Sequence, residues 1–67
     1  MLTKAEIELI DDWRRKVGFY IGVDRNAQGV NKLIICHGDH AECYDITDDY
    51  ITNEFILDAM ADFKSKE

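Results

Sequence analysis

Apolar side chains recur at every third or fourth position near the start of the chain, which is the spacing of one face of a helix. They are Leu2, Ala5, Leu9, Ile10, Trp13 and Val17. Thr3 stands three residues before Glu6, which is the capping-box pattern, so the helix is predicted to begin just after Thr3. Gly18 readily adopts the left-handed conformation that ends many helices. The pattern therefore predicts a first helix that ends at Val17.

From residue 19 the hydrophobic period changes to that of a strand. Phe19, Ile21 and Val23 alternate with polar or small residues, and the side chains of a strand point alternately to its two faces. We therefore expect a half-buried strand here, followed by a polar turn over Arg25–Gly29.

A β-hairpin is predicted in the middle of the chain. Lys32–His37 forms its first strand, and the Leu33–Ile35 run indicates a central strand with apolar cover on much of both faces. Gly38 and Asp39 suit a two-residue type II′ turn. This turn leads into a further strand over Ala41–Ile46.

A second helix is expected at the end of the chain. Its apolar stripe consists of Ile51, Phe55, Ile56, Ala59, Met60 and Phe63. We predict that it begins near Thr47, whose hydroxyl can cap the following amides, with Asp48 and Asp49 at the positive end of its dipole. Lys64 and Lys66 complement the opposite end.

The predicted order is helix, three-stranded antiparallel sheet, helix (α-β-β-β-α), an α+β fold in which residues 1–67 form a single domain. Hydrophobic residues make up 46% of the chain and charged residues 33%, which suffices for one small core. No apolar run approaches the ~18 residues of a membrane-spanning helix, and no signal-peptide pattern is present. We therefore expect a cytoplasmic protein with free thiols.

Charge is distributed unevenly along the chain. Residues 1–32 carry a net charge of +1 and residues 33–67 a net charge of −7. No Lys or Arg occurs between Lys32 and Lys64, whereas eight carboxylates do: Asp39, Glu42, Asp45, Asp48, Asp49, Glu54, Asp58 and Asp62. Such a surface repels nucleic acids and membranes and attracts basic partners. These eight residues are the predicted partner-binding site.

Within this set, Glu54, Asp58 and Asp62 are spaced four residues apart, which places them in one row on the last helix. Asp49 is expected to extend the row by one turn. One interpretation is a solvated face that keeps the protein soluble. The other is a row of carboxylates that takes the place of phosphates in a nucleic-acid-binding groove, where Lys and Arg await anions.

Four residues of the hairpin have side chains that can bind metals: Cys36, His37, His40 and Cys43. The predicted turn places His37 opposite His40 on one face of the sheet and both cysteines on the other. Zinc needs four donors that converge at about 2.0–2.3 Å, so we expect no metal and no cofactor. The cysteines are interpreted as small core residues. A metal-responsive regulator that uses the His pair stays open as a third hypothesis.

No catalytic site is expected, so the chain is predicted not to be an enzyme. Asp39, Glu42 and Asp45 surround the cysteines in sequence and disfavour a reactive thiolate. No phosphate-binding glycine loop, HExxH pattern or EF-hand loop is present.

The basic run Arg14–Lys16 ends the first helix, where positive charge complements the helix dipole. Asp11 and Asp12 are close enough in sequence to pair with it. Because the chain as a whole is acidic, we do not expect it to bind nucleic acid directly.

One family shows a similar succession of strand, turn, strand and helix in the second half of the chain. The matching segments are Lys32–Ile35, Tyr44–Thr47, Phe55–Ile56 and Ala61–Lys64. In this pattern the chain resembles the small acidic anti-CRISPR proteins of phages, in particular a type II-A inhibitor that occupies the PAM-reading site of the RNA-guided nuclease. It has a shorter and less acidic C-terminal part than that inhibitor. The resemblance implies a small phage-encoded DNA mimic that blocks a nucleic-acid-binding site.

The leading functional hypothesis is therefore a non-enzymatic inhibitor of a basic nucleic-acid-binding protein, such as a CRISPR effector or another host defence protein. The alternative is a homodimeric interaction module without mimicry. It would use apolar residues left on the sheet face that the helices do not cover.

Overall fold

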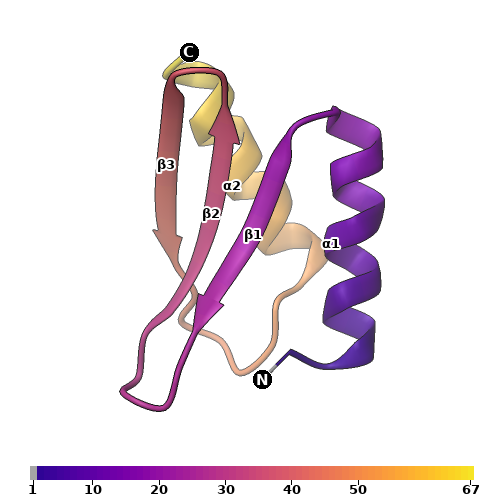
Figure 1. Cartoon of the computed structure of the whole chain (residues 1–67), viewed down its shortest axis with the longest axis vertical. Helices are drawn as coiled ribbons and strands as arrows, with labels where there is room; N and C mark the ends of the chain where they lie inside the picture. Colours follow the sequence, from indigo (N-terminus) through magenta and orange to yellow (C-terminus); the bar gives the residue numbers. More distant parts are fainter. Residues whose placement is uncertain (1) are drawn as a thin grey trace.

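The computed structural model describes residues 2–67 and contains two helices and a three-stranded antiparallel sheet (Figure 1). The elements in chain order are α1 (Lys4–Val17), β1 (Tyr20–Arg25), β2 (Asn31–His37), β3 (His40–Asp45) and α2 (Asn53–Ser65). The strand order is β1-β2-β3, so β2 is central, as predicted. The expected α-β-β-β-α arrangement is confirmed.

Local sequence signals determine both ends of α1. The Thr3 hydroxyl accepts a hydrogen bond from the Glu6 N–H at 3.1 Å, and the Glu6 carboxylate accepts one from the Thr3 N–H at 2.9 Å. These two bonds form the predicted capping box. Gly18 has φ = 80° and donates its N–H to the carbonyl oxygen of Arg14 at 2.9 Å, which is a left-handed C-terminal cap.

The hairpin between β2 and β3 also follows the prediction. Gly38 has φ = 63°, while Asp39 has a negative φ, and these are the signs that a type II′ turn requires. His37 pairs with His40, and Cys36 pairs with Ala41. Both histidines therefore lie on one face of the sheet.

Both helices cover the same face of the sheet. In Figure 1, α2 lies behind the strands and α1 lies beside β1. The core combines residues from the sheet, the helices and the segment before α2: Ile10, Trp13, Ile21, Leu33, Ile35, Ile46, Ile51, Ile56, Ala59, Met60 and Phe63. Removing such side chains from water is the main stabilising contribution in a domain of this size.

Within residues 2–67, no helix covers the opposite face of the sheet (Figure 1). Ile34 and Cys36 are half-buried there, and Cys43 is exposed. The interpretation of the cysteines as core residues is therefore wrong, because strand alternation places them on the face away from the helices. The aromatic ring of Tyr20 lies over Gly22 so closely that a Cβ at position 22 would overlap it.

The predicted start of the last helix at Thr47 is also wrong. The cap is Thr52, whose hydroxyl accepts a hydrogen bond from the Phe55 N–H at 3.2 Å. The reason lies in tertiary contacts: the side chain of Ile51 is buried, and its N–H donates to Glu6 Oε2 at 2.9 Å. Because this N–H is held by a distant carboxylate, the helix begins only after it. Arg25, expected in a turn, ends β1 instead.

Candidate partner-binding surface

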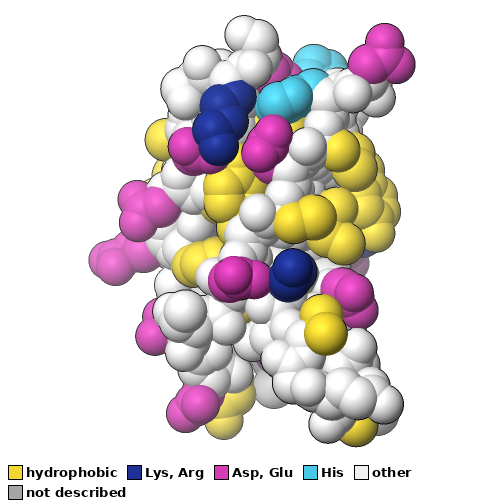
Figure 2. Space-filling view, turned by 90° about the vertical axis from the view of Figure 1, so that its left-hand side faces the viewer, with side chains coloured by type: hydrophobic (Ala, Val, Ile, Leu, Met, Phe, Trp, Pro, Cys, Tyr) yellow, Lys and Arg dark blue, Asp and Glu magenta, His cyan; other side chains and the backbone are white. Residues whose placement is uncertain are grey.

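Four of the predicted partner-binding carboxylates form what we call the acidic strip: Asp48, Asp49, Glu54 and Asp58. Glu54 and Asp58 lie one turn apart on the exposed side of α2. Asp48 and Asp49 lie in the loop before α2, so the expectation that Asp49 continues the helical row is wrong. All four are exposed, and none has an ion pair or side-chain hydrogen bond within residues 2–67. Figure 2 shows acidic side chains along the left-hand margin, whereas the Lys and Arg side chains in that view lie near the top and near the centre.

Asp62, the third member of the helical row, is occupied by contacts within the protein. Tyr44 Oη donates a hydrogen bond to Asp62 Oδ2 at 2.7 Å, and Lys66 Nζ lies 3.1 Å from the same oxygen. The hydrogen bond from Tyr44, together with Lys66, lowers the pKa of Asp62. Burial, with the nearby Asp62 charge, raises the pKa of Tyr44. Asp62 therefore anchors β3 to α2.

The other three predicted residues do not form one surface. Glu42 lies on the helix-covered face of β3, 3.7 Å from Lys66 and 3.8 Å from His40. Asp45 lies on the open face, where it is 3.9 Å from Lys32. Asp39 is exposed in the hairpin turn. Strand alternation separates Glu42 from Asp45 and places each near a positive or titratable group.

The His pair closes one end of the core. The ring of His37 stacks on Phe19 with centroids 4.6 Å apart, and the ring of His40 lies 4.5 Å from that of Phe63. His37 Nδ1 also lies 2.8 Å from a carboxylate oxygen of Glu67. Within the described part of the chain, no three His, Cys, Asp or Glu residues are grouped so as to hold a metal ion.

A buried ionic hub, not anticipated from the sequence, connects three parts of the fold. Glu6 is only 2% exposed and accepts hydrogen bonds from both terminal nitrogens of Arg25, at 3.1 and 3.0 Å. It also accepts the backbone N–H groups of Thr3 and Ile51. Burial by itself raises the pKa of Glu6, but these hydrogen bonds outweigh it and lower the pKa from 4.5 to about 2. The capping-box pattern identified Glu6 but gave no signal of Arg25.

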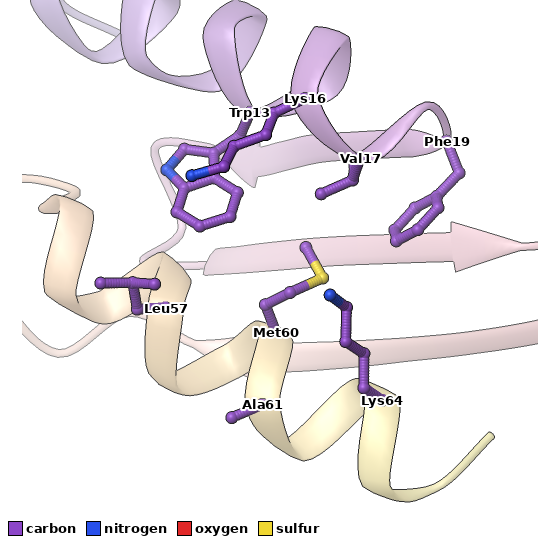
Figure 3. Close-up of a pocket in the computed structure, with 8 residues that line it drawn as sticks. All are labelled: Trp13, Lys16, Val17, Phe19, Leu57, Met60, Ala61 and Lys64. Atoms are coloured by element: carbon purple, nitrogen blue, oxygen red, sulfur yellow. The ribbon is translucent and has the colours of Figure 1, made fainter.

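A groove of about 580 Å³ lies between α1 and α2, away from these acidic residues (Figure 3). Its lining residues are Trp13, Lys16, Val17, Phe19, Leu57, Met60, Ala61 and Lys64. The lining contains no carboxylate, His or Cys, and Lys16 Nζ lies 4.8 Å from the centroid of the Trp13 ring. The groove therefore has an apolar floor with positive charge at its rim.

None of the helices within residues 2–67 has both the length and the apolar character needed to cross a membrane. No family model, curated protein or solved structure matches the chain.

Proposed function

We propose that the protein is a non-enzymatic inhibitor that binds and blocks a basic nucleic-acid-binding surface of another protein. The acidic strip would occupy the positions that phosphates take on that surface, where Lys and Arg side chains form charge-assisted hydrogen bonds with anions. A CRISPR effector or another host defence protein is the first class of target to test. The observation that carries the proposal is the absence of any partner for the strip's carboxylates within residues 2–67.

Two acidic residues of α1 lie beside arginines, whereas two acidic residues of α2 have no cation beside them, and this contrast supports the proposal. On α1, Asp11 lies 3.5 Å from Arg14 and Asp12 lies 2.5 Å from Arg15. On α2, Glu54 and Asp58 are neighbours of like charge, an arrangement that costs a few tenths of a kcal/mol. Within residues 2–67, Asp11 and Asp12 of α1 therefore have a cation beside them, whereas Glu54 and Asp58 of α2 have none and can meet an external cation.

The test is a pull-down of candidate targets at about 0.1 M salt, where charge contacts are only partly screened, with duplex DNA as competitor. The variant Asp49→Lys/Asp58→Lys reverses two charges of the strip and leaves the structural contact of Asp62 intact. Its matched control, Glu8→Lys/Asp24→Lys, makes the same charge change at exposed positions elsewhere. We expect the first variant to lose binding and the control to keep it.

Equal loss of binding in both variants would show that net charge alone drives binding. Full binding by both would remove the acidic strip from the mechanism. Competition by duplex DNA distinguishes a nucleic-acid site on the target from any other basic surface.

The open face of the sheet favours a second candidate, a homodimeric interaction module. Tyr20 is 53% exposed on this face, next to the half-buried Ile34. Figure 2 shows hydrophobic side chains gathered along its right-hand margin. An interface of this kind would be insensitive to salt. A dimer in light scattering that Ile34→Lys converts to monomer would support the module, and an unchanged mass would exclude this face.

A further inference from the structure

Four exposed residues of α2 form a stripe that is spaced like the seam of a coiled coil. Glu54, Leu57, Ala61 and Lys64 follow one another at intervals of three, four and three residues, and this spacing keeps them on one side of a helix. Leu57 is 47% exposed although it is a large apolar residue. Glu54 and Lys64, at the two ends, have no ion pair among residues 2–67.

The stripe is complementary to itself when two copies run in opposite directions. Reversal of the order places Glu54 opposite Lys64 of the partner subunit, and Leu57 opposite Ala61 of the partner subunit. The first pairing joins opposite charges, and the second sets a large side chain against a small one. A twofold axis repeats each contact, as an isologous interface requires.

We propose that a second copy of the chain docks antiparallel along this stripe and forms a weak symmetric dimer. Leu57, Ala61 and Lys64 lie along the side of α2 that borders the groove between the helices (Figure 3). The small side chain of Ala61 lets the partner's Leu57 approach the apolar lining formed with Trp13 and Met60. The positive rim of the groove receives the partner's Glu54.

The dimer is weak for two reasons. The thirteen residues of α2 span about 20 Å, so the buried area falls below the ~800 Å² per partner of a stable interface. The twofold axis also places Asp58 of both copies on the same side of the seam, where they repel each other. We therefore expect a dissociation constant at the weak end of the affinity scale, on the order of 0.1–1 mM.

The test is sedimentation equilibrium of the full chain and of variants in which the charges of the stripe are reversed. Concentrations reach about 1 mM, the upper end of this affinity range. Glu54→Lys and Lys64→Glu should each weaken association about tenfold, because like charges then meet at both ends of the seam. The double variant should restore it, since the pairs re-form with reversed sign. The matched controls Lys4→Glu and Glu8→Lys, on exposed positions of α1, should leave association unchanged.

Asp58→Asn distinguishes this dimer from the proposed inhibition. The substitution removes the repulsion between the two copies and should tighten the dimer, whereas it should weaken binding to a basic target. A wild-type chain that stays monomeric at about 1 mM, or a double variant that fails to recover association, would overturn the proposal. Association that Ile34→Lys abolishes would place the contact on the sheet instead.

Discussion

Glu6 is the one charged side chain buried in the core of the described chain. Its carboxylate holds the start of α1, the end of β1 and the loop before α2 together through Thr3, Arg25 and Ile51. Loss of one partner of a buried pair is costly because the other charge stays desolvated. Glu6 therefore links three segments that are far apart in the sequence.

Acid should weaken this hub in a defined pH range. A folded-state pKa below the unfolded value means that the unfolded chain binds the proton more tightly, so the contribution of Glu6 is complete above about pH 4.5 and is lost as the pH falls through about 2. Urea unfolding across this range should show a shallower pH dependence for Glu6→Gln than for wild type. Glu8→Gln, on the exposed side of α1, should retain the wild-type slope; equal slopes for all three proteins would contradict the assignment.

Gly22 and Tyr20 form a coupled pair on the open sheet face. A Cβ at position 22 would overlap the Tyr20 ring, so Gly22→Ala should displace the ring; because the ring is 53% exposed and can move, the loss of unfolding free energy should be at most about 0.5 kcal/mol. In a Tyr20→Ala background the same substitution should cost much less, because no ring obstructs it. Thermal unfolding of the four proteins measures this coupling. Additive effects would show that the ring does not restrict position 22.

At the scale of elements, α2 shows how a long-range contact sets a helix boundary. Thr47 and Thr52 are both exposed threonines near the helix, and both suit a helix cap. Only Thr52 caps, because the residue before it is buried and hydrogen-bonded to α1. The carboxylates of Asp48 and Asp49 consequently lie outside the helix.

Alanine substitution separates the two threonines. Thr52→Ala removes the acceptor for the Phe55 N–H and should lower the unfolding free energy by about 1 kcal/mol. Thr47→Ala should change it by less than about 0.5 kcal/mol, as is usual for surface positions. Chemical denaturation of both variants gives the comparison. A larger loss from Thr47→Ala would place the helix start where the sequence pattern had indicated.

At the scale of the molecule, the acidic strip and the apolar side chains of the open sheet face lie on different sides. The two helices cover one face of the sheet, and the acidic strip lies on α2 and its preceding loop (Figures 1 and 2). The open face carries Ile34 and Cys43 together with the Lys32–Asp45 pair. With a net charge of −6, the compact state concentrates like charges that the unfolded chain would separate.

Salt should therefore stabilise the protein. Raising NaCl from about 0.05 to about 0.5 M screens the repulsion among exposed carboxylates and should raise the thermal midpoint by a few degrees. The Asp49→Lys/Asp58→Lys variant carries less of this repulsion and should respond less. Differential scanning calorimetry measures both proteins. A midpoint that falls with salt would show that attractive pairs such as Asp12–Arg15 outweigh the repulsion.

The sequence showed which residues of the candidate site carry a negative charge. It did not show which of these carboxylates are bound by other side chains of the protein. Glu54, Asp58 and Asp62 form one series in sequence, yet only Asp62 is bound, by Tyr44 from a strand eighteen residues away. Glu42 is similarly drawn toward Lys66. A charge pattern contains no information on partners that only packing brings close.

What the sequence determined by itself is the local structure: the capping box at Thr3, the left-handed cap at Gly18, and the hairpin turn with its register. These depend on contacts between residues a few positions apart, so the residues concerned are adjacent in the sequence. Tertiary structure alone decided the Glu6 hub and the start of α2, because each depends on residues brought together only when the sheet and both helices share one core. The hydrogen bond between Glu6 and Ile51 spans 45 residues, and no local propensity encodes a contact at that separation.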